Sequence, residues 1–249
     1  GAIKLMRGLA RADERARFRQ ERQILAALDH PGIARLIDGG ETSSGQPYLV
    51  VEFVRGETLA QRLKSNPPDL ALALSWIERI ATAVQHAHQN LVVHRDLKPA
   101  NVMVTPEGDV KLLDFGVAKL LEQGAGGDHS TRVFTPGYAA PEQMAGRPVG
   151  TAADIFSLGR MLDELRVASP KDRELAAIAA KATAEDPEDR YPTMAAFRED
   201  LVHWRLGLPV RATNPGWFRR LVKHLRRHPW GTLAGTAALL LIAVLAWRW

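Results

Sequence analysis

The sequence predicts an α+β fold in which a small sheet-bearing part precedes a larger helical part and one membrane-spanning helix. Residues 46–54 (QPYLVVEFV) form a β-branched and aromatic run bounded by turn residues, which is typical of a strand. Residues 70–89 repeat apolar side chains at helical spacing, and residues 230–247 are apolar or small and carry no charge. We therefore expect the sheet near the start of the chain and helices in most of the remainder.

The composition is that of a globular protein. Of the 249 residues, 46% are hydrophobic and 24% are charged, which argues against disorder. Cysteine is absent, and this excludes disulfide bridges, a thiol nucleophile and cysteine-ligated zinc. The net charge of +5 could indicate a nucleic-acid partner, but much of the basic excess lies in one cluster before the apolar C-terminal stretch. We therefore expect no nucleic-acid partner.

The order of the elements follows from changes in periodicity along the chain. Residues 11–28 have helical spacing with many arginines and glutamates, until a proline and a glycine break the pattern. After Gly56 the chain changes to long amphipathic helices, which continue to about Arg205. The glycine-rich residues 122–128 (EQGAGGD) are expected to form a loop.

Two short strands, residues 102–104 and 110–113, are predicted to close as a hairpin around the turn sequence TPEGD. The open end of this hairpin would hold Asn101 and Asp114 side by side. An amide oxygen and a carboxylate suit Mg²⁺, a hard cation that keeps few protein ligands while phosphates supply further oxygens. The hairpin therefore indicates a candidate magnesium site.

Two charged residues, Asp96 and Lys98, precede this hairpin. A carboxylate can accept the proton of a hydroxyl group, and a lysine can offset the charge on a transferring phosphoryl group. Each of these charges costs free energy to bury unless it finds a partner. The charges around the hairpin therefore either satisfy one another in the fold or hold a ligand.

Residues 230–247 (WGTLAGTAALLLIAVLAW) are just long enough to cross a hydrocarbon layer about 30 Å thick. Tryptophans at both ends suit the two membrane interfaces, and a buried C-terminal helix is the alternative. Basic residues precede the stretch at Arg219, Arg220, Lys223, Arg226 and Arg227. By the positive-inside rule this cluster keeps the upstream chain in the cytoplasm. The cluster either also contacts anionic lipid headgroups or is only a topology signal.

Three motifs follow the sheet-bearing part, namely HRDLKPAN at 94–101, DFG at 114–116 and APE at 140–142. In this order and spacing they resemble the catalytic loop, the magnesium loop and the end of the activation segment of protein kinases. With TPGYAAPE, DIFSLG and EDPEDRY, the chain is most similar to bacterial eukaryotic-like (Hanks-type) serine/threonine kinases, many of which are anchored by one membrane helix. The resemblance covers about residues 1–205 and implies a bilobal protein-kinase fold.

The resemblance implies catalytic roles for the charged residues around the hairpin. Asp96 would be the base or orienter of the substrate hydroxyl, Lys98 a contact to the γ-phosphate, and Asn101 and Asp114 the magnesium ligands. Lys4, in the sequence AIK, would hold the α- and β-phosphates. These roles make ATP and Mg²⁺ the expected cofactors and protein serine and threonine hydroxyls the expected substrates.

Further residues match the nucleotide-binding positions of the family. Glu21 would be the ion-pair partner of Lys4, although either residue alone would be taken for a solvated surface charge. Val51 would be the gatekeeper, followed by a hinge from Glu52 to Val54 that binds adenine through its backbone.

The adenine ring would lie between two apolar side chains. Ala2 and Met103 match the positions that contact the ring from above and below. For Met103 an ordinary core position is the alternative, because a methionine in a short apolar strand needs no ligand to explain it.

The resemblance also implies a regulatory site. Arg95 would pair with a phosphorylated residue of the activation segment, because bidentate guanidinium contacts would order that loop. Ser130, Thr131 and Thr135 are the candidates for phosphorylation. Thr135 of TPGY looks more like a residue that contacts the catalytic loop, so Ser130 or Thr131 is preferred as the regulatory site.

Other matched residues are expected to have structural roles. Glu142 and Arg190 occupy positions that form a buried salt bridge in the family, and Asp154 would hold the backbone of the catalytic loop. His86 and His88 lie on a predicted helix without a metal-like constellation, so we expect packing or surface roles for them.

The sequence departs from the family pattern at two places. The glycine-rich loop that should precede the AIK strand is not found ahead of Ala2. We therefore expect an N-terminally truncated fragment with an incomplete small lobe, poor ATP binding and low stability. Between Leu165 and Asp172 there is no room for a helix that family members usually place there, which makes substrate choice harder to infer.

These observations divide the chain into four segments. They are a partial kinase small lobe without the glycine-rich loop (residues 1–54), a large lobe (55–206), a basic juxtamembrane linker (207–229) and a transmembrane helix (230–247). Gly231 and Gly235 form a weak G-x-x-x-G pattern that would permit a homodimer.

The leading functional hypothesis is a serine/threonine protein kinase of bacterial signalling that also phosphorylates its own activation segment. Its kinase domain would lie in the cytoplasm, anchored to the inner membrane. A membrane-tethered pseudokinase scaffold is the alternative, disfavoured because the complete set of catalytic residues is present. A small-molecule phosphotransferase suits the long activation segment less well.

Overall fold

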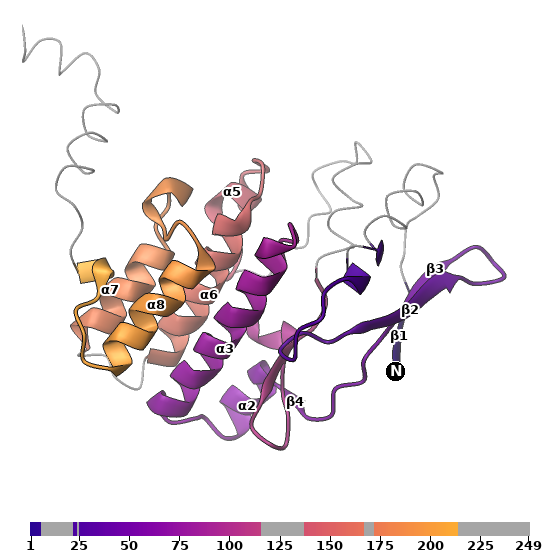
Figure 1. The fold of residues 1–249 in the computed structure, drawn as a ribbon, viewed down its shortest axis with the longest axis horizontal. Coiled ribbons are helices and arrows are strands. Elements are labelled where there is room, and N and C mark those ends of the chain that lie inside the picture. The colour runs from indigo at the N-terminus through magenta and orange to yellow at the C-terminus, as the bar shows by residue number, and fades with distance from the viewer. Residues whose placement is uncertain (6–21, 24, 116–136, 167–171, 214–249) are drawn as a thin grey trace, which may run out of the picture. The chain divides into compact units, whose positions relative to one another are not determined.

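The computed structural model describes residues 1–5, 22–23, 25–115, 137–166 and 172–213 (Figure 1). Residues 1–210 form one compact unit and residues 211–249 a second. In the second unit the described part is a short 3₁₀ turn, η5 (Arg211–Thr213). The elements that position the candidate site all belong to the first unit.

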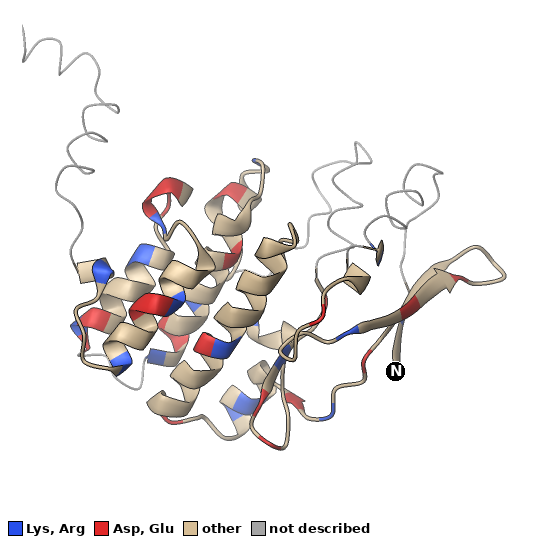
Figure 2. Cartoon of the chain, viewed as in Figure 1, with Lys and Arg blue, Asp and Glu red and all other residues tan. Residues whose placement is uncertain are grey.

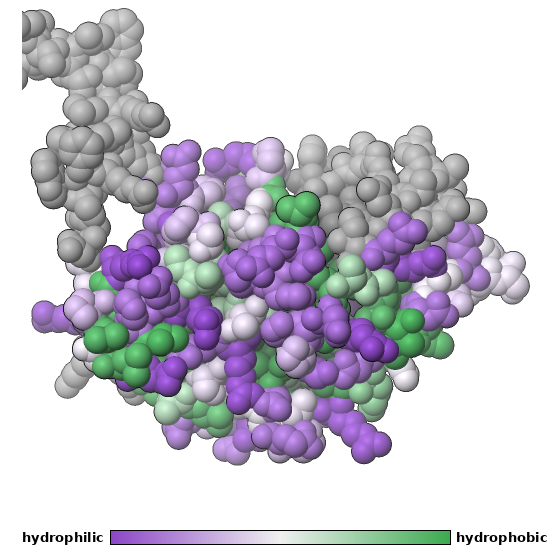
Figure 3. Space-filling model, viewed as in Figure 1, coloured by the Kyte–Doolittle hydropathy of each residue, from purple (hydrophilic) through white to green (hydrophobic). Residues whose placement is uncertain are grey.

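The first sheet contains three antiparallel strands in the order β1–β3–β2. Its strands are β1 (Ala2–Leu5), β2 (Leu36–Glu41) and β3 (Pro47–Val51). Side chains of β1 alternate, so that Lys4 is half-buried while Ile3 and Leu5 are 70% and 54% exposed. Figure 3 shows hydrophobic surface beside β1, which is an edge strand of the described sheet.

The predicted strand at residues 46–54 is confirmed in its centre but ends at Val51. The backbone N–H of the next residue, Glu52, donates to the carbonyl oxygen of Arg35 at 2.8 Å and does not continue the ladder with β1. The chain thus leaves the sheet at the point where the hinge is expected.

The predicted hairpin is also confirmed. It consists of β5 (Val102–Val104) and β6 (Val110–Leu112), and a short strand that the sequence did not reveal, β4 (Glu57–Thr58), pairs with β5. Gly108 closes the turn with a φ of 86°, a backbone conformation that glycine adopts without strain. Its N–H donates to the carbonyl oxygen of Thr105 at 2.9 Å.

Helices and 3₁₀ turns make up most of the described residues after β4. The described ones are α2 (Leu59–Ser65), α3 (Leu70–Gln89), α5 (Pro141–Met144), α6 (Thr151–Leu165), α7 (Arg173–Ala182) and α8 (Met194–Arg205), with 3₁₀ turns η1 (Pro99–Asn101) and η4 (Pro187–Asp189). The predicted helix at residues 70–89 matches α3 at both ends. The last of the described α-helices, α8, ends at Arg205, as the periodicity indicates.

Side-chain caps explain where four of the described α-helices begin. Asp69 accepts the N–H of Leu72 at 2.8 Å and so fixes the start of α3. Asp172 and Thr193 cap α7 and α8 in the same way, and Thr58 forms a capping box with Gln61 at α2. Short polar side chains therefore set the boundaries that the hydrophobic periodicity only approximates.

The core of the first unit is built around α3, which packs against α6, α8 and β6 (Figure 1). Small and large apolar side chains alternate along its buried face, among them Ala73, Trp76, Ile80 and Ala87. The indole N–H of Trp76 donates to the carbonyl oxygen of Gly108 at 3.0 Å, so the same helix also anchors the hairpin turn.

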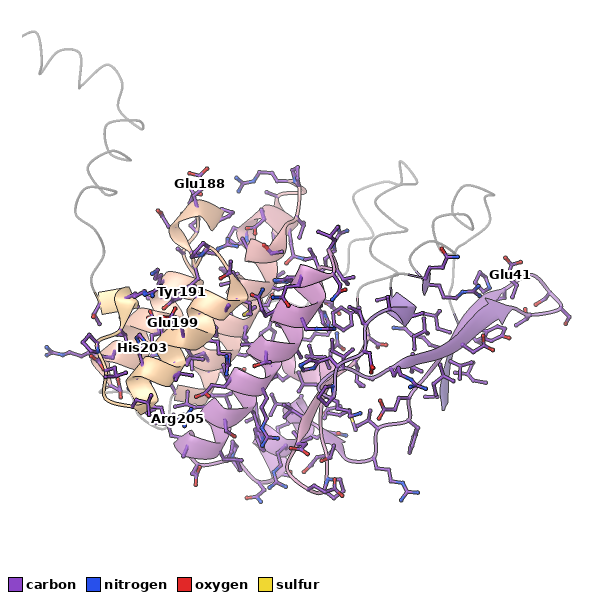
Figure 4. All side chains as sticks on the ribbon, viewed as in Figure 1. Glu41, Glu188, Tyr191, Glu199, His203 and Arg205 are labelled. Atoms are coloured by element: carbon purple, nitrogen blue, oxygen red, sulfur yellow. The ribbon has the colours of Figure 1, made fainter. Side chains whose placement is uncertain are left out.

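Polar contacts attach α8 to its neighbours. Figure 4 labels Tyr191, whose hydroxyl donates to the buried carboxylate of Asp200 at 2.8 Å, and Arg205, which pairs with Glu78 of α3 at 3.1 Å. Burial raises the pKa of Tyr191, and the hydrogen bond to Asp200 raises it further. In Figure 2 acidic and basic residues are interspersed over these helices.

Several predictions concern residues outside the described ranges. Only the end of the predicted helix 11–28 is described, where residues 22, 23, 25 and 26 are helical. Glu21, the glycine-rich residues 122–128 and the apolar stretch 230–247 lie outside. None of the described helices is both long and apolar enough to cross a membrane.

The salt bridge between Glu142 and Arg190 is confirmed, and it is almost inaccessible to solvent. Two parallel hydrogen bonds of 2.7 and 2.8 Å join the guanidinium group to the carboxylate, and the two residues are 2% and 4% exposed. Arg190 also donates to the carbonyl oxygens of Ala152 and Ala184 and lies over the ring of Phe156. This contact joins the start of α5 to the segment before α8.

Removing one partner of this salt bridge should strongly destabilise the fold. Glu142→Gln leaves the buried guanidinium charge unpaired, so we expect the free energy of unfolding to fall by about 3–5 kcal/mol in urea denaturation. Arg79→Gln breaks an exposed pair with Asp109 and should cost less than about 1 kcal/mol. Equal losses in the two variants would contradict this account.

Candidate active site

The segment 94–101 is held in place by the buried carboxylate of Asp154, which α6 supplies. Its oxygens accept the backbone N–H groups of His94 and Arg95, each at 2.8 Å. Arg95 has a φ of 64°, an uncommon conformation for a residue with a side chain, so these hydrogen bonds stabilise a bend that the local sequence would not favour. The structural role expected for Asp154 is confirmed.

His88 completes this arrangement. Its Nε2 lies 2.8 Å from Oδ2 of Asp154, and its side chain is only 6% exposed. Packing was one of the two roles expected for His88, but the structure adds a specific polar contact. The sequence could not show it, because the two residues are 66 positions apart.

His94 links the segment 94–101 to the DFG segment. Its Nε2 lies 3.0 Å from the carbonyl oxygen of Leu113, and its ring packs on Phe115 with centroids 4.7 Å apart. Burial lowers the pKa of His94, although the charge of Asp154 opposes the shift. The neutral ring therefore donates Nε2–H to Leu113, while Nδ1 faces the N–H of Asp96 at 3.4 Å.

Three predicted site residues meet at the end of this segment. Nζ of Lys98 lies 2.9 Å from Oδ2 of Asp96, and the amide nitrogen of Asn101 donates to the same oxygen at 3.0 Å. A second hydrogen bond, 2.8 Å long, joins that amide to the backbone oxygen of Asp96. The carboxylate of Asp96 is thus oriented by a lysine and an amide, and it is 22% exposed.

Asp114 lies at the open end of the hairpin, as predicted. The N–H of Leu113 donates to the carbonyl oxygen of Asn101 at 2.8 Å, which brings the two predicted magnesium ligands to one end of the hairpin. Nζ of Lys4 is 2.9 Å from Oδ1 of Asp114, and both side chains are 42% exposed. Lys4 therefore contacts the hairpin from the facing sheet. Its expected partner, Glu21, lies outside the described residues.

The residues predicted to surround adenine lie at the junction of the two sheets. Ala2 is directly opposite Val51 in the ladder between β1 and β3. Val51, Lys4 and Asp114 line one pocket, whose remaining walls are mainly apolar. Met103 is half-exposed while its neighbours Val102 and Val104 are buried, so its side chain lies on the other face of the hairpin from the core.

The end of the activation segment is fixed to α6. Ser157 donates to the carbonyl oxygen of Tyr138 at 2.9 Å, and Arg160 donates to that of Gly137 at 2.9 Å. The hydroxyl of Tyr138 donates to Glu164, and burial raises the pKa of Tyr138. A small pocket beside Asp96 is lined by Tyr138 and Ser157. Ser130, Thr131 and Thr135 lie outside the described residues.

Comparison with known proteins identifies the family of this chain. A family model described as the protein kinase domain matches residues 1–199. The chain belongs to the protein kinase family. The α+β protein-kinase fold predicted from the motifs is therefore confirmed.

Kinases from several bacteria are among the curated proteins similar to this kinase domain. The serine/threonine-protein kinase PknB of Mycobacterium leprae is 33% identical over 248 residues, which cover 85% of this chain and 40% of that protein. PknB of Mycobacterium tuberculosis gives the same identity and coverage over 247 residues. The probable serine/threonine-protein kinase PknB of Bifidobacterium longum is 32% identical over 260 residues, with 86% and 37% covered. The chain thus spans about 40% of the length of the relatives it matches.

Two residues of the kinase-domain site were missed by sequence reasoning. The amide of Gln143 donates to the carbonyl oxygen of Arg95 at 2.8 Å and accepts the N–H of Ala140 at 3.1 Å, so it bridges the catalytic loop and the APE motif. Lys111 of β6 pairs with Glu52 at 2.5 Å. For Lys111 the alternation in VKL gave a usable signal, since a charged residue between two apolar ones must face away from the core.

Acidification should destabilise this kinase domain because the folded state holds His94 neutral. The pKa of His94 is lowered from 6.5 by burial, so the unfolded chain binds a proton that the folded chain resists. The stability that the folded state gains from a neutral His94 is fully present above the pKa that His94 has in the unfolded chain. It is lost as the pH falls from there toward the pKa of His94 in the folded chain. We expect the difference in Tm between about pH 7.5 and about pH 5.5 to shrink in His94→Gln.

His203→Gln, at a half-buried histidine of α8, is the control and should keep the wild-type difference in Tm. Its ring lies 3.2 Å from the carbonyl oxygen of Pro209 at the end of α8, far along the chain from the catalytic loop. If the Tm of His94→Gln changed with pH as much as that of the wild type, other titratable groups would be responsible for the acid destabilisation.

Proposed function

We propose that this chain is the kinase domain of a bacterial serine/threonine protein kinase that transfers the γ-phosphoryl group of ATP to protein hydroxyl groups. The observation that carries the proposal is the contact of Lys98 and Asn101 with one carboxylate, Asp96, beside the Lys4–Asp114 pair, in a member of the protein kinase family. The proposed lobes are residues 1–54 and 55–206.

In the proposed reaction a substrate hydroxyl oxygen forms a bond to the γ-phosphorus while the bond to the ADP oxygen breaks. Asp96 orients the hydroxyl group and accepts its proton, and ADP departs with the electrons of the broken bond. Lys98, already 2.9 Å from Asp96, is placed to offset the negative charge on the transferring group.

Asn101 and Asp114 fit the requirements of Mg²⁺. They offer an amide oxygen and a carboxylate at one end of the hairpin, and this cation accepts few protein ligands when phosphate oxygens complete its shell. The metal, when bound, neutralises charge on the phosphates. Asp114 would then exchange Lys4 for the metal, which leaves the ammonium group of Lys4 for the α- and β-phosphates, with Glu21 as its further partner.

Regulation would act through the activation segment. We propose that phosphorylation of Ser130 or Thr131 supplies a partner for Arg95, while Thr135 contacts the catalytic loop. Support comes from the anchoring of the following residues, Gly137 and Tyr138, to α6, because a phosphate-ordered loop needs a fixed end.

Phosphate mapping tests the kinase assignment. After incubation of the full-length protein with Mg²⁺ and ATP, mass spectrometry should find phosphate on Ser130, Thr131 or Thr135. Asp114→Ala should abolish it by removing a metal ligand, and Asp96→Asn should slow transfer by about 10²- to 10⁴-fold because the base is lost.

Equal absence of phosphate from wild type and Asp114→Ala, with added protein substrates also unmodified, would reject the kinase assignment. A pseudokinase scaffold would then be the better account. Unchanged phosphorylation in Asp114→Ala would instead place the metal site elsewhere.

We further propose that residues 230–247 anchor the protein in the inner membrane, with residues 207–229 as a basic linker on the cytoplasmic side. The support is the uncharged 18-residue run from Trp230 to Trp247, with the basic cluster directly before it. The proposed helix could pair with a second copy through Gly231 and Gly235.

Flotation on a density gradient tests the anchor. The full chain should float with lipid vesicles and resist extraction at alkaline pH, because about 18 apolar residues bury in the hydrocarbon layer. A chain ending at residue 229 should be released under the same conditions. Release of both chains would reject a spanning helix.

A further inference from the structure

The hairpin carries a lysine that reaches the segment proposed to bind adenine. Nζ of Lys111, on β6, lies 2.5 Å from Oε1 of Glu52, although the two residues are 59 positions apart. Their side chains are 24% and 35% exposed, so this ion pair is partly shielded from solvent. It is therefore expected to contribute more free energy than a fully solvated surface ion pair.

Lys111 stands on the face of the hairpin that also presents Met103. The two residues are directly opposite each other in the ladder between β5 and β6. Their strand neighbours Val102, Val104 and Leu112 are 0%, 5% and 1% exposed and form the core-facing side. Because strand side chains alternate, Lys111 lies beside the residue proposed to contact the adenine ring.

The carboxylate of Glu52 is engaged at both oxygens. Oε1 pairs with Lys111, and Oε2 accepts the backbone N–H of Arg35 at 3.2 Å. Burial raises the pKa of this carboxyl, but the hydrogen bonds from Lys111 and Arg35 outweigh it, so the net shift is downward and the group is charged at neutral pH. Glu52 thus acts as a charged bridge at the first residue of the hinge.

The strand β6 also fixes the hinge through a second route. Its residue Leu112 donates to the carbonyl oxygen of Gly32 and accepts the N–H of Ala34, at 2.8 and 2.9 Å. One residue further on, Arg35 accepts the N–H of Glu52. Backbone contacts therefore hold the start of the hinge from one side, while Lys111 holds its carboxylate from the hairpin.

We propose that Lys111 is a positioning residue for the nucleotide: by holding Glu52, it sets the hinge backbone at residues 52–54 against Met103 at the spacing that a purine ring requires. After Val51 the hinge has left the strand ladder, so one backbone hydrogen bond to Arg35 and the contacts of the Glu52 carboxylate fix its start. A hinge fixed before binding loses less freedom when the nucleotide arrives. The inference rests on the proposed function only in taking a purine nucleotide as the ligand.

The test compares nucleotide affinity in Lys111→Met, Lys111→Arg, Glu52→Gln and the double variant Lys111→Met/Glu52→Gln of the full-length protein. Direct titration with ATP and Mg²⁺ should show binding weakened by about three- to tenfold in Lys111→Met. Lys111→Arg keeps the charge and should stay near wild type. Because the two residues act as one unit, the double variant should bind no more weakly than either single variant.

Kinetics separate positioning from a general structural role. In Lys111→Met the KM for ATP should rise with the Kd, while kcat and the KM for a peptide substrate stay within about twofold of wild type. Arg205→Met is the matched control, since it breaks the ion pair between α8 and Glu78 of α3, away from the hinge. Its ATP affinity should be unchanged.

Wild-type ATP affinity in Lys111→Met, or equal weakening in Lys111→Arg or in Arg205→Met, would overturn the proposal. Failure of the kinase assignment would give a distinct result, because the wild-type protein would bind ATP without transferring phosphate. The comparison of ATP Kd values would then still test the positioning role of Lys111. A wild-type protein that binds no ATP would overturn both.

Discussion

The buried carboxylate of Asp154 is the contact on which the geometry of the candidate site depends. It holds two successive backbone N–H groups at His94 and Arg95, where the chain takes a conformation that costs free energy for a residue with a side chain. A hydrogen-bonded charge inside a protein is stable only when its partners are fixed, and His88 supplies the third of them. The position of Asp96, one residue further along, follows from this frame.

The charges of the site satisfy one another within the fold. Asp96 is held by Lys98 and Asn101, and Asp114 by Lys4. Mutual pairing, the first of the two alternatives posed by the sequence, is therefore observed, and it does not conflict with holding a ligand. The side chains of Lys4 and Asp114 are each 42% exposed, so exchange of this pair for the proposed metal and phosphates would require little desolvation.

The two faces of the hairpin β5–β6 have different environments. Its valines and Leu112 pack into the core beside α3, whereas Met103 and Lys111 face the other way. Because successive side chains of a strand point to opposite faces, the charged residue of VKL faces away from the core and pairs with a partner outside it. That partner is Glu52, the first residue of the proposed hinge.

The sequence by itself determined the local elements and the family. Hydrophobic periodicity predicted α3, the turn sequence TPEGD predicted the hairpin, and the spacing of HRDLKPAN, DFG and APE identified the protein kinase fold that the family match confirms. Some long-range partners were decided only by the tertiary structure. His88 with Asp154, Gln143 with Arg95, and Lys111 with Glu52 join residues 48 to 66 positions apart. Periodicity reports which face of an element is buried, but the partner across that face is set by how the elements pack together.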